Sequence, residues 1–98
     1  MALLPNEVKI GEYLADSNSI LFNNAYEASG SNSIAMGQGT IATNSQAIAI
    51  GKDTIASGIN SLTFGQNSIA SGTCALAGGS GTLASGSYSI ALGSGSIS

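Results

Sequence analysis

Large and small apolar residues alternate along most of this chain, and the pattern returns every 14 residues. Cut at Ser33, the sequence reads SIAMGQGTIATNSQ, AIAIGKDTIASGIN, SLTFGQNSIASGTC, ALAGGSGTLASGSY and SIALGSGSIS. Positions 2 and 9 of these units are always Ile or Leu, position 5 is always Gly, and position 10 is Ala in every complete unit. A fixed period of this kind predicts a repeat architecture in which each unit stacks on the next.

Two short strands are expected in each unit. The alternation in SIAMG is the two-residue period of a strand with one buried face, and TIASG shows it more weakly. Glycine is frequent at position 12 and constant at position 5, where positive φ suits a sharp turn: Gly37, Gly51, Gly65, Gly79 and Gly93. A helix does not fit, because apolar residues do not recur at spacings of three and four residues. Each glycine within a helix would also cost about 1 kcal/mol. The sequence therefore predicts an all-β fold, a parallel β solenoid of two thin layers.

The N-terminal part departs from the repeat. SILFNNAYEASGSN, from Ser19, keeps the period but places Asn23 at the glycine position and Glu27 at the position of the second Ile. Terminal coils of solenoids are usually atypical because they cap the stack. We therefore predict an N-terminal capping or docking segment over residues 1–18 and roll repeats over residues 19–98.

The large apolar residues predict a core one side-chain layer thick. They occupy positions 2, 4 and 9, and the predicted structural core is Ile34, Met36, Ile41, Ile48, Ile50, Ile55, Leu62, Phe64, Ile69, Leu76, Leu83, Ile90 and Leu92. On this interpretation the alanines at position 3 face outward and form a subunit interface, because small side chains let backbones approach closely: Ala35, Ala49, Ala77 and Ala91. The sequence thus predicts a symmetric oligomer.

The unit SIAMG followed by TIATNSQ closely resembles the head repeats of trimeric autotransporter adhesins, the YadA-like heads, whose signature is a small residue, Ile or Val, Ala, Ile or Val, then Gly. The resemblance covers residues 19–98 and, more loosely, residues 7–18. Thr63 and Gly78 depart from the signature, and Gly78 predicts a locally thin core. The resemblance implies a left-handed parallel β-roll and a homotrimer. It also implies a nonenzymatic adhesive segment on the bacterial cell surface, attached to host cells or extracellular surfaces.

Two alternative functions remain open at this point. Whole adhesins of this type carry an export signal, a coiled-coil stalk and a membrane barrel. This sequence has no basic region followed by an apolar run of signal length and no 18 consecutive apolar residues, so we expect neither an export signal nor a membrane span in it. The same roll would serve in a phage tail fibre for host attachment, on the virion. It would also serve as a subunit of a self-stacking extracellular filament.

The composition argues against several classes of binding partner and activity. The chain has two Lys or Arg and five Asp or Glu, a net charge of −3, and no His. Without a basic stripe, nucleic acid is not an expected partner. Without His, paired carboxylates in the repeats or a nucleophile beside a base, we expect neither enzymatic activity nor a cofactor. Asp53 is the only acidic residue after Glu27, so calcium-binding turns are not expected either.

A few residues allow sharper hypotheses. The single cysteine, Cys74, falls in a variable turn and permits no disulfide within the chain. Threonine or serine occupies position 8 of every unit, which would form a ladder of hydroxyl groups along the stack: Thr40, Thr54, Ser68, Thr82 and Ser96. Such a ladder suggests an ice-binding face, but that face would need a second Thr two residues later, where position 10 is Ala. Hydrogen bonding between stacked hydroxyls is therefore favoured instead. The scattered Tyr13, Tyr26 and Tyr88 do not define a ligand site, and no host ligand is identified.

Overall fold

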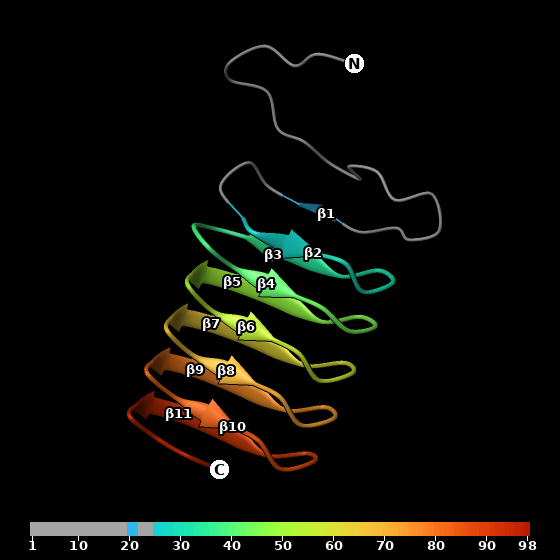
Figure 1. Ribbon diagram of the computed structural model, residues 1–98. Helices are drawn as coiled ribbons and strands as arrows, with labels where there is room; N and C mark the ends of the chain where they lie inside the picture. Colours follow the sequence, from blue (N-terminus) through green and yellow to red (C-terminus); the bar gives the residue numbers. More distant parts are fainter. Residues whose placement is uncertain (1–19, 22–24) are drawn as a thin grey trace, which may run out of the picture.

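The computed structural model describes residues 20–21 and 25–98, which form a stack of parallel strands in two sheets (Figure 1). The six-stranded sheet has the order β1 (Ile20–Leu21), β3 (Ile34–Met36), β5 (Ile48–Lys52), β7 (Leu62–Gln66), β9 (Leu76–Ser80) and β11 (Ile90–Ser94). The five-stranded sheet contains β2 (Glu27–Ala28), β4 (Ile41–Ala42), β6 (Ile55–Ala56), β8 (Ile69–Ala70) and β10 (Leu83–Ala84). The predicted capping segment, residues 1–18, lies outside the described residues.

Strand pairing follows the sequence period. Each residue pairs in parallel with the residue one coil further on, as in Ile48 with Leu62 on one sheet and Ile55 with Ile69 on the other. The predicted all-β parallel solenoid, with two short strands in each 14-residue coil, is therefore confirmed. Residues 20–21 and 25–98 include no helix, and hence no helical segment of the length and hydrophobicity that a membrane crossing requires.

The turns depend on residues with positive φ. The glycines at position 5 have φ between 102° and 121°, which confirms the role predicted for them. The residues at position 14 have φ near 60°, although three of them are Gln46, Cys74 and Tyr88, which adopt this conformation less readily than Asn. Their backbone N–H groups donate to carbonyls of the preceding coil, as in Cys74 to Ile59 at 2.8 Å. These bonds hold successive turns in register.

The glycines at position 12 have a different role from the predicted one. Gly58 and Gly72 are not among the residues with positive φ, so the conformational explanation is wrong at this position. A Cβ built on Gly58 would lie 2.0 Å from the carbonyl oxygen of Gly72 in the next coil. Glycine at these two positions accommodates the close approach of the stacked backbones, whereas the coil from 33 to 46 carries Asn44 at position 12.

The interior of the roll contains only small side chains from Ser33 to Ala91. The position 3 residues Ala35, Ala49 and Ala77 are fully buried, with no solvent exposure. Position 10 contributes further alanines to the same interior, and positions 1 and 8 add mainly hydroxyl-bearing residues: Ala42, Ala56, Ala70 and Ala84, with Ser33, Thr40, Thr54, Ser61, Ser68 and Thr82. The two sheets thus enclose a thin core of Ala, Ser and Thr.

The predicted assignment of the inner and outer faces is therefore wrong, and the two faces are exchanged. None of the large residues expected in the core belongs to the fully buried set; all are half-buried or exposed on the outer faces of the two sheets: Ile34, Met36, Ile41, Ile48, Ile50, Ile55, Leu62, Phe64, Ile69, Leu76, Leu83, Ile90 and Leu92. The alanines expected at a subunit interface point inward: Ala35, Ala49, Ala77 and Ala91. The physical reason is that alternation separates two faces of a strand without saying which face is inside.

Replacing Gly51 by Ala is expected to destabilise the roll strongly, by about 2 kcal/mol or more, because φ there is 121° and the added Cβ would lie 2.1 Å from the carbonyl oxygen of Gly65. Gly81→Ala is the matched control. Gly81 also has positive φ, 68°, but a Cβ there would meet nothing within 4 Å. The control should cost only about 1 kcal/mol. Urea unfolding at a fixed chain concentration measures both; equal losses would contradict close stacking at position 5.

Candidate interaction surface

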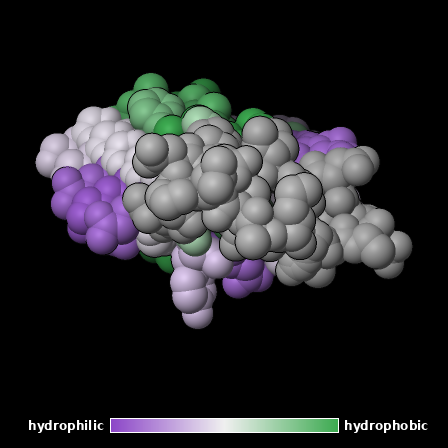
Figure 2. Space-filling view, turned by 90° about the horizontal axis from the view of Figure 1, so that it is seen from above, coloured by the Kyte–Doolittle hydropathy of each residue, from purple (hydrophilic) through white to green (hydrophobic). Residues whose placement is uncertain are grey.

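The roll has two unlike apolar outer faces. The wide face lies on the six-stranded sheet, carries the residues of positions 2 and 4 in two columns, and consists of Ile34, Met36, Ile48, Ile50, Leu62, Phe64, Leu76, Ile90 and Leu92. The narrow face lies on the five-stranded sheet and has one column at position 9, consisting of Ile41, Ile55, Ile69, Leu83 and Ile97. Looking down the stack, Figure 2 shows strongly apolar side chains gathered along one long side of the roll, with hydrophilic residues toward its narrow ends.

The wide face is the more exposed of the two apolar faces over most of its length. Ile50 and Phe64 are 38% and 40% exposed, and Ile90 and Leu92 are 60% and 52% exposed. On the narrow face only Ile97 falls in the exposed class. Five coils at ~4.8 Å each give the wide face a length of about 24 Å. Soluble monomers seldom leave a continuous apolar surface of this kind open, so the wide face is the strongest candidate for an interface.

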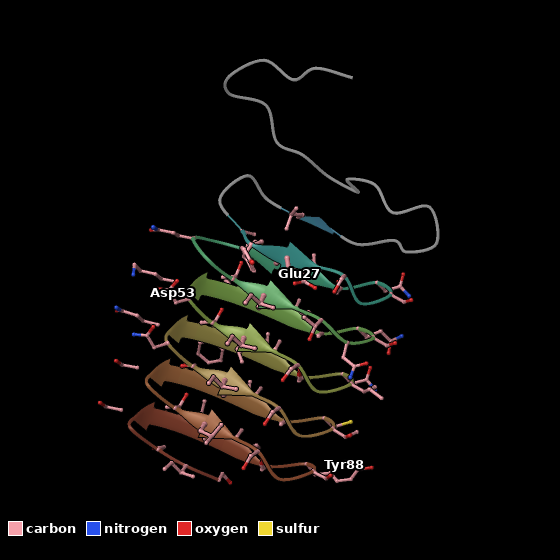
Figure 3. The ribbon with its side chains drawn as sticks, in the orientation of Figure 1. Glu27, Asp53 and Tyr88 are labelled. Atoms are coloured by element: carbon pink, nitrogen blue, oxygen red, sulfur yellow. The ribbon has the colours of Figure 1, made fainter. Side chains whose placement is uncertain are left out.

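In the described coils one charged side chain borders the wide face, because Lys52 ends β5 two residues after Ile50. Lys52 and Asp53 form an ion pair of 2.9 Å at one edge of the roll, where both side chains are about half exposed. Glu27 precedes the narrow column, since it pairs with Ile41. Figure 3 shows Asp53 and Tyr88 at opposite edges of the stack, with Glu27 over a strand between them. An exposed ion pair contributes little to stability, and the two columns of the wide face themselves contain no charge.

The hydroxyl ladder at position 8 is internal. Thr40, Thr54 and Ser68 have no solvent exposure, so they do not offer a surface to ice. The Thr82 hydroxyl donates to the Ser68 hydroxyl of the preceding coil at 2.9 Å, so the predicted hydrogen bonding between stacked hydroxyls is present at this pair. Thr40 instead donates to the carbonyl of Gly37 at 3.1 Å. The ladder therefore stabilises the interior of the roll rather than forming a binding surface.

The turn residues singled out from the sequence are dispersed. Cys74 is exposed at position 14, and Tyr88 is 76% exposed at the same position one coil later. Tyr26 is 72% exposed near the other end of the described stack. Tyr13 lies outside the described residues. These side chains do not converge on one site.

Gly78 interrupts the wide face but does not thin the core, so the prediction of a locally thin core is wrong. Gly78 occupies position 4, and its backbone pairs with that of Phe64 in the preceding coil. A Cβ on Gly78 would lie 2.2 Å from Cζ of Phe64, because the aromatic ring covers the glycine. Gly78 is consequently buried although it is on an outer face. The large ring and the missing side chain compensate each other.

A model of the YadA head domain repeat, spanning two copies, matches residues 28–54, 49–75 and 72–96. The chain belongs to the YadA head-repeat family. The predicted resemblance is therefore confirmed, and each matched segment of the YadA head repeats corresponds to about two of the coils described above. No curated protein and no solved structure matches the chain.

Sequence reasoning missed the wide face as a surface, although a signal was present in the YadA head repeats. Column 3 varies only between Ala and Thr from Ala35 to Ala91, and column 10 is Ala from Ala42 to Ala84. Column 4 instead includes Met36, Phe64 and Gly78, and so spans a wide range of volumes. A close-packed interior tolerates little change of volume, so the wide range of volumes in column 4 indicates an outer column, and its neighbour, column 3, then faces inward.

Proposed function

We propose that this chain is a nonenzymatic adhesive segment of a bacterial surface fibre, which acts as a homotrimer and attaches to host cells or extracellular surfaces. The observation that carries the proposal is a continuous apolar wide face on a chain that belongs to the YadA head-repeat family. YadA-like heads are the heads of trimeric autotransporter adhesins, so the family supports both the trimer and the location at the cell surface. The left-handed coil is part of the same proposal.

In the proposed trimer, three wide faces pack about a common axis. Burying the exposed fractions of Ile50, Phe64 and Leu92 removes apolar area from water, at about 25 cal/mol per Å². The two columns of the wide face carry no charge, and Lys52 beside them is paired with Asp53, so packing the columns together buries no unpaired ionised side chain. The narrow face and the polar edges would remain on the outside of the fibre.

The proposed adhesive mechanism is multivalent. Each coil presents the same kinds of groups at its edges and narrow face, and the coils repeat along the fibre. Many weak contacts of this type add to a strong attachment when they form together. The absence of His and of a nucleophile beside a base in the sequence supports a role without catalysis.

Ile50→Glu is expected to convert the trimer to monomers, because it places a charge within the packed wide faces. The matched control is Ile55→Glu on the narrow face, where Glu27 already occupies the equivalent position of an earlier coil. Light scattering across a dilution series should give the mass of three chains for the native protein and for Ile55→Glu, and of one chain for Ile50→Glu. A monomeric native chain, or equal behaviour of the two variants, would contradict the proposed interface. Open-ended growth in mass would indicate a filament instead.

Attachment itself is tested with beads that carry the native chain, Ile50→Glu or Ile55→Glu at the same surface density. Native and Ile55→Glu beads should be retained on a layer of cultured epithelial cells or on immobilised extracellular matrix, and retention should rise steeply with bead density because binding is multivalent. Ile50→Glu beads should be retained much less. Equal retention of native beads and of uncoated beads on every surface would contradict the adhesive role.

A further inference from the structure

We propose that Phe64 and Gly78 together fix the axial register of the three chains on the wide face. This inference rests on the proposed trimer, and its partners are two further copies of the same chain. It goes beyond the existence of the trimer, because it names the residues that determine how the copies align along the fibre axis.

A repetitive face specifies register poorly. Column 2 of the wide face is Ile or Leu in every coil from Ile34 to Ile90, and column 4 begins with Met36 and Ile50. If one chain slides by one coil, similar side chains again lie opposite each other, and only the contacts of a terminal coil are lost. Strands with such uniform faces are prone to alternative pairings unless a distinctive residue opposes them.

The pair of Phe64 and Gly78 breaks the uniformity at one level. Phe64 is the single aromatic residue of the wide face within residues 25–98, and it is 40% exposed. Its Cζ, Cε1 and Cε2 atoms all lie within 2.6 Å of the place where a Gly78 Cβ would be. The ring thus leans along the stack toward the next coil and occupies part of the space of two coils. Neighbouring coils carry Ile50 and Leu92 in the same column.

In the aligned trimer, three Phe64 rings meet at the same level, and the three Gly78 positions leave room for them. A slip by one coil would instead oppose a ring of one chain to Ile50 or to the level of Gly78 in another. One level would then be overfilled and another underfilled, and close-packed interfaces tolerate neither. The copies of this chain are suitable partners because the same irregularity recurs in each at the same height, and neither column carries a charge that would repel a copy.

The test uses Phe64→Ile with Gly78→Ile, which restores a uniform column without placing a side chain against the ring. The matched control is Leu76→Ile with Ile90→Leu, which changes two column 2 residues in adjacent coils and leaves the pair and both cysteine positions intact. All proteins carry Cys74→Ser, which removes the only native thiol. Phe64→Leu, which keeps Gly78, is a second variant in case the double variant does not fold.

Register is measured by disulfide formation between chains. Chains with Ile48→Cys are mixed unfolded with ¹⁵N-labelled chains carrying Leu62→Cys, refolded together and oxidised. Positions 48 and 62 are one coil apart, so dimers of mixed isotope mass report a slip of one coil, and dimers of uniform mass report alignment. Cα atoms must lie within about 7 Å for a disulfide to form.

We expect the mixed fraction to be low for the native pair and the control, and to rise several-fold in the double variant and in Phe64→Leu. An unchanged mixed fraction in variants that keep the mass of three chains would overturn the register proposal and leave the trimer intact. A trimeric mass with no disulfide dimers of either kind would show that the wide faces do not meet, which overturns this inference as well. A monomeric native chain would instead refute the proposed function on which it rests.

Discussion

The thin interior of the roll is the constraint on which the rest of the structure depends. Two sheets face each other across Ala, Ser and Thr, and residues such as Ala49 and Thr54 have no exposure at all. Protein interiors are close-packed, so this space does not accept an Ile or Leu without displacing a sheet. Every large apolar side chain must then lie on an outer face. The molecule consequently has a small internal core and an extended apolar exterior, which is the reverse of an ordinary globular domain.

The same close stacking explains the glycines and the turns. A Cβ at Gly51 or Gly58 would meet a carbonyl oxygen of the next coil at about 2 Å. The spacing of the coils therefore requires glycine at position 5 and favours it at position 12, where one coil carries Asn44. Position 14 carries no glycine, and Gln46 and Tyr88 adopt positive φ there while their N–H groups bond to the preceding coil. The conformational free-energy cost of positive φ at these residues is offset by the hydrogen bonds that link successive turns.

Much of the fold was predictable because it depends on period and turn chemistry. The 14-residue repeat, the parallel strands and the positive φ of the position 5 glycines all followed from spacing, and the family match over residues 28–96 agrees with the motif. The inner and outer faces were not assigned correctly, since an alternating strand such as Ile48–Ala49–Ile50 has the same pattern whichever face is buried. The covering of Gly78 by Phe64 also escaped sequence analysis, because it depends on the ring orientation between coils. The trimer and the left-handed coil stay predictions.

The most direct test of this account is the reactivity of single cysteines at adjacent positions 55 and 56, in a background with Cys74→Ser. Ala56 has no solvent exposure, whereas Ile55 is partly exposed on the narrow face, which remains outside in the proposed trimer. The account predicts that Ile55→Cys reacts readily with a thiol reagent in the native protein and that Ala56→Cys is protected until the roll unfolds. Rapid labelling at position 56 with protection at position 55 would contradict it, because the large residues would then form the interior.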